Sequence, residues 1–197
     1  MRYDVGIFYV SSGGRTRRVA EQINSEFARF IKVRLFNINE CHTNDLKRAD
    51  LLILGSPTYG IGSLHPKWAR WRQLLETSCT DFNNQEIAVF VLGDLRHHPK
   101  TFGGAIWHFE SMLTSLGAQT IGHSTIPGNK AIPAPGLVLD ASSGQRLLQD
   151  SVANWLAQLW TESTFLSSWS ALAHNKDFCA PMCRILDRQS KSLEQGK

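Results

Sequence analysis

Three short segments carry the residues whose types and spacing could bind a ligand, and the first of them suits a phosphate. It joins an apolar stretch to the expected start of a helix and consists of Ser11, Ser12, Gly13, Gly14, Arg15 and Thr16. Its glycines allow backbone N–H groups to turn toward one anion, its hydroxyl groups can donate further hydrogen bonds, and a helix N-terminus carries partial positive charge. The alternative is an ordinary turn capped by a serine. The segment is neither a P-loop nor G-x-G-x-x-G, so it does not indicate a nucleoside triphosphate or dinucleotide site.

The second segment presents an aromatic side chain between glycines. It spans residues 55–64 and contains Pro57, Thr58, Tyr59, Gly60 and Gly62. The tyrosine ring could stack on a flat ligand, since aromatic faces pack well against other π-systems. The alternative is an aromatic residue that only covers a surface loop.

The third segment spans residues 92–102 and begins with Leu92, Gly93 and Asp94. Asp94 directly follows an apolar run, and His98 could offer a second flat face to a ligand. The adjacent pair His97 and His98 also allows a metal-site hypothesis. No third ligand lies at a suitable spacing, so we expect no metal here.

The pattern of apolar residues predicts the elements that position these segments. Short, nearly continuous apolar runs are typical of strands buried on both faces, and amphipathic stretches are typical of helices. Val19, Ile23 and Phe27, for example, form one apolar stripe on a helix. We expect strands at 5–10, 32–36, 51–54 and 87–92, a fifth strand in two pieces at 120–122 and 137–139, and helices at 16–30, 66–76, 101–116 and 143–159.

Strands that alternate with helices in this way predict an α/β fold with a doubly wound parallel sheet. Ligands of this fold class bind outside the carboxyl ends of the strands, where the three segments should lie. Residues 124–136 contain Pro127, Pro133 and Pro135. We therefore expect a loop there that interrupts an edge strand.

The order and spacing of the three segments resemble the flavodoxin family from Tyr3 to about Leu159. The first segment resembles the family pattern T-x-T-G-x-T, with Gly13 in place of the middle hydroxyl residue. Residues 50–68 resemble the P-T-W-x-x-G loop and its flanks, with Tyr59 in place of tryptophan. Residues 92–94 resemble the L-G-D of the third loop, and residues 137–140 resemble the late L-A-L-D strand.

The resemblance implies a five-stranded sheet in the order 2-1-3-4-5, with flavin mononucleotide (FMN) across the strand tips, and a carrier of single electrons between redox partners. Residues 11–16 would hold the phosphate, Tyr59 would cover one face of the isoalloxazine ring, and His98 would stand where the family has a second stacking tyrosine. Gly60 would turn its carbonyl toward N5 of the flavin, which favours the neutral semiquinone. The implied cofactor-binding residues are Ser11, Ser12, Gly13, Gly14, Arg15, Thr16, Pro57, Thr58, Tyr59, Gly60, Gly62, Leu92, Gly93, Asp94 and His98.

Two other functions stay open at this point. One is a flavodoxin-like reductase that takes hydride from a nicotinamide cofactor and reduces a quinone or a similar acceptor. The other is a regulatory or interaction module whose C-terminal segment carries the function.

The charge distribution indicates what kind of partner the chain binds. The net charge is +4 and the sequence pI is about 9.0, whereas familiar flavodoxins are acidic. Lys and Arg are scattered and do not alternate with aromatic residues, so we expect no nucleic-acid partner. The cations in or beside the three segments could be an ordinary solvated surface, or a basic rim that docks an acidic partner. They are Arg15, Arg17, Arg18, Lys67, Arg70, Arg72, Arg96 and Lys100.

The remaining expectations concern location and domain organisation. The N-terminus lacks the order of a signal peptide, and no apolar run approaches the roughly 18 residues of a membrane span. We therefore expect a cytoplasmic monomer without membrane insertion.

We expect an FMN-binding domain at 1–160 and a C-terminal helical extension at 161–197. The extension should pack on the domain through Phe165, Trp169 and Leu172, and a second helix should follow with Phe178, Met182, Ile185 and Leu186. Cys179 and Cys183, with His174 upstream, could bind a metal or form a disulfide, but buried thiols are the expectation.

Overall fold

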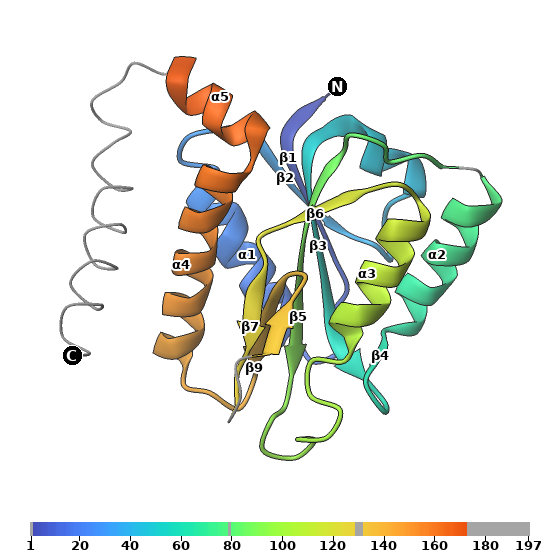
Figure 1. Cartoon of the computed structure of the whole chain (residues 1–197), viewed down its shortest axis with the longest axis vertical. Helices are drawn as coiled ribbons and strands as arrows, with labels where there is room; N and C mark the ends of the chain where they lie inside the picture. Colours follow the sequence, from blue (N-terminus) through green and yellow to red (C-terminus); the bar gives the residue numbers. More distant parts are fainter. Residues whose placement is uncertain (1, 79, 129–131, 173–197) are drawn as a thin grey trace.

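A computed structural model of the 197-residue chain describes residues 2–78, 80–128 and 132–172, with the backbone alone for residues 170–172. A central β-sheet separates two layers of helices (Figure 1). α1 (Arg15–Phe27) and α4 (Gln145–Glu162) cover one face of the sheet. α2 (Pro66–Thr77) and α3 (Ala105–Ser115) cover the other face.

The sheet is parallel and follows the order β2-β1-β3-β5-β6. Its strands are β1 (Tyr3–Tyr9), β2 (Val33–Asn37), β3 (Ala49–Tyr59), β5 (Glu86–Gly93) and β6 (Gln119–Ile121). β9 (Leu137–Asp140) also pairs with β5, beside its carboxyl half, while β6 pairs beside its amino half. The predicted doubly wound α/β sheet in the order 2-1-3-4-5 is therefore confirmed, with its fifth position divided between β6 and β9.

Alternating residues of the central strands point to opposite faces of the sheet and pack into two separate hydrophobic cores. Ile7 of β1 packs with α1 and α4, whereas its neighbour Phe8 packs with α2 and α3. Trp68 is fully buried in the core of α2 and α3, and Trp155 is buried in the core of α1 and α4. Strands buried on both faces are nearly continuous in apolar residues, which is why their positions were readable from the sequence.

The residues between β6 and β9 differ from the prediction. They were expected to form a loop at 124–136, but β7 (Ser124–Ile126) pairs antiparallel with β8 (Ile132–Ala134). Pro133 lies in β8 opposite Thr125. A proline is tolerated there because a two-stranded hairpin consists only of edge strands.

The predicted third strand at 51–54 and the predicted loop at 55–64 also need correction. β3 continues to Tyr59, and β4 (Ser63–Leu64) pairs antiparallel with its end. The true turn is confined to residues 60–62. The apolar run ends at Leu54 because small and polar residues follow it, although residues 55–57 still pair with β5. The end of the strand then forms a hairpin with β4.

Two predicted helices are shorter in the structure. α3 begins at Ala105 rather than at Thr101, because residues 94–104 close a series of turns through His98 N to Asp94 O and Thr101 N to His98 O. α1 ends at Phe27 rather than at Phe30. A short 3₁₀ helix, η1 (Thr43–Arg48), leads into β3.

The helical segment α5 (Thr164–Leu172) follows α4 directly and lies over its end (Figure 1). Leu166 is fully buried, and Phe165 and Trp169 pack against the core of α1 and α4. The side chain of Leu172 and the second helix expected at Phe178–Leu186 lie outside the described residues, as do His174, Cys79, Cys179 and Cys183. None of the described helices has the length and apolar character needed to span a bilayer.

Candidate functional site

The register of the parallel strands brings the three predicted segments to one edge of the sheet. Tyr9 lies opposite Gly55, and Pro57 lies opposite Leu92. Gly93 lies opposite Asp140 of β9. The carboxyl ends of β1, β3 and β5 therefore lie side by side at the lower edge of Figure 1.

The first segment turns the chain from β1 into the N-terminus of α1. Gly14 caps the helix with φ +79, a left-handed conformation that glycine adopts without a steric cost. The first turn of α1 contains no acidic residue, and Arg18 N donates to Gly14 O at 3.1 Å. The earlier N–H groups of a helix have no intrahelical acceptor. This helix end is therefore suited to an anion.

Two buried hydroxyl groups at the strand tips have no hydrogen-bond partner among the described residues. They are Ser11 Oγ, just after β1, and Thr58 Oγ1, near the end of β3. A buried polar atom without a partner costs about 1–3 kcal/mol, so such atoms mark positions where a ligand or a water can bind. A phosphate with an attached sugar alcohol would supply several oxygens to both positions. The donor set at the strand tips therefore fits FMN.

The second segment is a hairpin that presents Tyr59. Thr58 pairs with Leu64 and Tyr59 pairs with Ser63. Gly60 has φ +53, and a Cβ there would meet no atom within 4 Å, so backbone conformation rather than space favours glycine. The Tyr59 side chain is 50% exposed. A flat ligand can therefore reach its ring.

The third segment is held in place by hydrogen bonds to two carboxylates. Asp94 accepts from His97 N at 3.0 Å and contacts His97 Nδ1 at 2.9 Å. The hydrogen bonds from His97 lower the pKa of Asp94, and the charge of Arg15 lowers it further. The Asp94 carboxylate thus holds the start of the third segment through its hydrogen bonds with His97.

Asp140 was not among the predicted site residues, although the strand that ends there was predicted. Its Oδ1 accepts from Leu95 N at 3.1 Å and from Ser142 N at 2.9 Å. Burial alone would raise the pKa of Asp140, but the hydrogen bonds from Ser142, Leu95 and Ser143 outweigh it and lower the pKa. Asp140 therefore anchors the start of the third segment from the neighbouring strand.

The structure brings all fifteen predicted residues to this edge, and the second and third segments touch each other. A Cβ on Gly62 would lie 3.4 Å from Thr101 O, so the turn after Tyr59 packs against the end of the third segment. His98 is exposed, and its backbone N donates to Asp94 O at 2.9 Å. The role of each residue toward a cofactor, including the pairing of Tyr59 with His98, stays a prediction.

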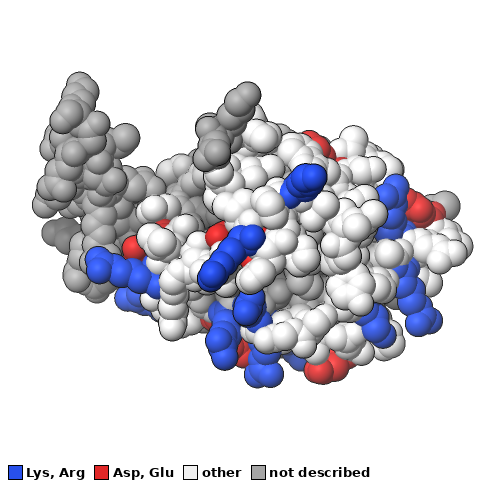
Figure 2. Space-filling model, turned by 90° about the horizontal axis from the view of Figure 1, so that it is seen from below, with Lys and Arg blue, Asp and Glu red and all other residues white. Residues whose placement is uncertain are grey.

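Positive side chains outnumber negative ones on this face of the molecule (Figure 2). Arg17 pairs with Glu21 at 2.7 Å, and Arg72 pairs with Glu76 at 2.8 Å. The other rim cations form no ion pair within the part of the chain that the structure describes. They are Arg15, Arg18, Lys67, Arg70, Arg96 and Lys100.

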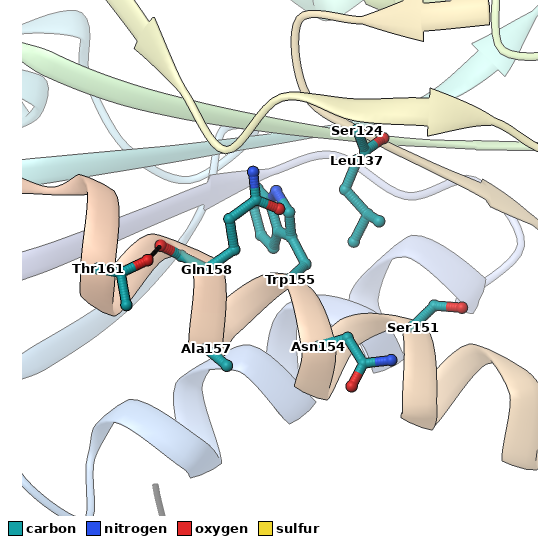
Figure 3. A pocket seen from close by; sticks show the side chains of 8 residues that line it. All are labelled: Ser124, Leu137, Ser151, Asn154, Trp155, Ala157, Gln158 and Thr161. Atoms are coloured by element: carbon teal, nitrogen blue, oxygen red, sulfur yellow. Dashed lines mark hydrogen bonds between the residues drawn. The ribbon is translucent and has the colours of Figure 1, made fainter. Parts of the chain in front are cut away.

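Two hollows lie beside α4. The one in Figure 3 has a volume of about 410 Å³, and its lining is uncharged. Trp155 and Gln158 of α4 point toward the strands there, while Ala157 points away. None of the predicted site residues lines it. The other hollow, of about 450 Å³ between α1 and α4, includes Arg15 and Leu92 and so adjoins the strand tips.

Comparisons with known proteins agree with this geometry. The sequence profile of the family described as flavodoxin matches residues 7–155. A flavodoxin from Nostoc sp. is 32% identical over 170 residues, which cover 82% of this chain and 98% of that protein. A flavodoxin from Synechococcus elongatus is 31% identical over 166 residues, which cover 80% of this chain and 96% of that protein.

Solved structures share the fold. The Fusobacterium nucleatum flavodoxin bound to flavin mononucleotide superposes with a TM-score of 0.72 at 22% identity, covering 80% of this chain and 97% of that one. Oxidised flavodoxin 2 from Bacillus cereus superposes with a TM-score of 0.64 at 23% identity, covering 81% of this chain and 99% of that one.

Proposed function

Because the chain belongs to the flavodoxin family, we propose that it is an FMN-containing carrier that passes single electrons between redox partners. The observation that supports this best is the pair of buried hydroxyl groups, Ser11 Oγ and Thr58 Oγ1, which lack partners among the described residues and lie at the switch point of the sheet. Ligands of doubly wound folds bind at this point. Flavodoxins are carriers rather than enzymes, so the chain needs no substrate of its own.

FMN supplies the redox chemistry, and the residues of this chain bind and orient it. In the proposal, residues 11–16 hold the phosphate at the N-terminus of α1. Thr58 donates to the sugar alcohol, and Tyr59 and His98 flank the ring. Asp94 and Asp140 keep the third segment folded around it.

The rim cations indicate the charge of the partner's docking surface. Six of them form no ion pair among the described residues, so they are available to a partner whose docking surface is acidic. A monomer and a cytoplasmic location complete the proposal, and size-exclusion chromatography and cell fractionation test them. Residues 1–160 would form the FMN-binding domain, with residues 161–197 as a helical extension packed on it.

The cofactor can be identified directly. Flavin released by heating the purified chain should be FMN, at one equivalent per chain and without covalent attachment. FAD as the sole product, or a colourless protein that fails to bind added FMN, would contradict the proposal. Rapid oxidation of NADPH without a separate reductase would favour the alternative, a reductase of quinones or similar acceptors.

A further inference from the structure

The ring of Tyr59 packs against the imidazole of His65 in an edge-to-face contact. The two ring centroids lie 5.6 Å apart, and the ring planes meet at 63°. Tyr59 ends β3 and is half exposed, so the hairpin fixes its backbone but leaves much of its ring free. Contact with the imidazole therefore restricts the positions that the ring can take.

His65 is itself held at the junction of β4 and α2. Its Nδ1 accepts a hydrogen bond from Lys67 N at 3.2 Å and so caps α2. Its backbone N donates to Oγ of the buried Ser56 at 3.4 Å, and Trp68 N donates to its carbonyl at 2.8 Å. An Nδ1 that accepts belongs to a neutral imidazole with its proton on Nε2.

Protonation of Nδ1 would remove its hydrogen bond with Lys67 N, which fixes the position of the imidazole beside the Tyr59 ring. A proton on Nδ1 would face the N–H of Lys67, and the positive ring would lie at the positive end of the α2 dipole. Burial, and then the charge of Lys67, holds the pKa of His65 below its usual value. Within the described ranges no carboxylate pairs with His65, and Tyr59 of β3 is the titratable group against its ring.

We propose that neutral His65 is the positioning residue of Tyr59, so that the aromatic face offered to FMN is held at neutral pH and released when His65 is protonated. The consequence for the flavin rests on the proposed function. The coupling of His65 to Tyr59 does not, because it can be measured on the chain without FMN.

The first test is an NMR titration of the FMN-free full chain. The ring signals of Tyr59 should shift with the titration of His65, at a midpoint below about 6.5. In His65→Asn they should stay constant, because asparagine keeps a capping acceptor for Lys67 N but does not titrate. Tyr59 signals that ignore the His65 titration would overturn the proposal, whether or not the chain binds FMN.

The second test compares FMN dissociation constants between neutral pH and about pH 5. The FMN phosphate titrates near pH 6, so wild type alone is not diagnostic. Acidification should weaken FMN binding about twofold to tenfold more in wild type than in His65→Asn. His42→Asn, which removes the exposed histidine before η1, should behave as wild type.

A double variant separates positioning from a direct charge effect on the flavin. In a Tyr59→Ala background, His65→Asn should no longer change the pH dependence of FMN binding. An equal effect of His65→Asn with and without the Tyr59 ring would overturn the proposal, as would an unchanged pH dependence in the single variant.

Discussion

The hydroxyl group of Thr58 is buried without a partner among the described residues, and this predicts opposite effects on stability and binding. Thr58→Val should raise the unfolding free energy of the FMN-free chain by about 1 kcal/mol, because an unpaired buried polar atom is removed. The same change should weaken FMN binding, because the proposed donor to the sugar alcohol of the cofactor is lost. Chemical denaturation and fluorescence titration measure the two effects.

Thr80→Val is the matched control for this substitution. Thr80 is also buried, but its hydroxyl lies 2.8 Å from Ser78 Oγ and is satisfied. Its removal should lower the unfolding free energy and leave FMN affinity unchanged. If Thr58→Val destabilises the FMN-free chain as Thr80→Val does, Thr58 does not await a ligand.

Site residues that are adjacent in sequence were easier to predict than residues whose partners lie far away along the chain. The hydroxyl-rich turn at 11–16, the proposed phosphate site, could be recognised because its hydroxyl groups and glycines are adjacent in sequence. Asp140 could not, since its partner Leu95 lies 45 residues away and is brought close only by the pairing of β9 with β5. The sequence contains one local indication of the role of His65: it directly precedes Pro66, and proline is common at the first position of a helix.

The segment α5 is tied to the sheet by one carboxylate. Glu86 of β5 accepts hydrogen bonds from Ser163 Oγ and from the N and Oγ1 of Thr164. Burial alone would raise the pKa of Glu86, but these hydrogen bonds outweigh it and lower the pKa. A lowered carboxyl pKa adds stability that is present above the unfolded value, about 4.3, and is lost as the pH falls through the folded value.

Glu86→Gln should therefore lower the unfolding free energy by about 1 kcal/mol at neutral pH, and the difference from wild type should shrink as Glu86 is protonated. Denaturation at several pH values measures this. The control is Glu26→Gln, whose carboxylate makes an exposed ion pair with Arg29 at 3.3 Å and should contribute less than about 0.5 kcal/mol. Equal losses in both variants would mean that Glu86 does not anchor α5.

Elements buried on both faces were predicted well, and short paired elements were not. The strands at β1, β3 and β5 are visible as apolar runs because they lie in two cores. The β7–β8 and β3–β4 pairings involve only two or three residues on each strand. Segments this short show no recognisable alternation of apolar and polar residues, so the sequence does not reveal them as strands.

The rim cations of the whole molecule should shift the reduction potential of the bound flavin. Reduction adds negative charge, and one unit charge at ~10 Å changes its energy by roughly 0.4–1.7 kcal/mol. The double variant Lys67→Glu, Arg70→Glu should lower the potential by tens of millivolts, since ~1.4 kcal/mol corresponds to ~59 mV for one electron. The shift should shrink at high salt.

Lys47→Glu is the control for this charge reversal. Lys47 is exposed and lies in η1, just before the amino end of β3 and so at the opposite edge of the sheet. Its reversal changes the net charge but should leave the potential nearly unchanged. Lys47→Glu changes the net charge by −2 and the double variant changes it by −4, so a shift about half as large from Lys47→Glu would show that net charge, and not the rim, sets the potential.

The most direct test of the proposed electron-carrier function is an anaerobic reductive titration of the purified chain, in which the absorption spectrum is recorded after each addition of reductant. An FMN carrier of single electrons should take up two electrons in two separate steps, with the one-electron-reduced flavin accumulating between them. A chain that contains no flavin, or whose flavin takes up both electrons in a single step without a detectable one-electron form, would contradict the account.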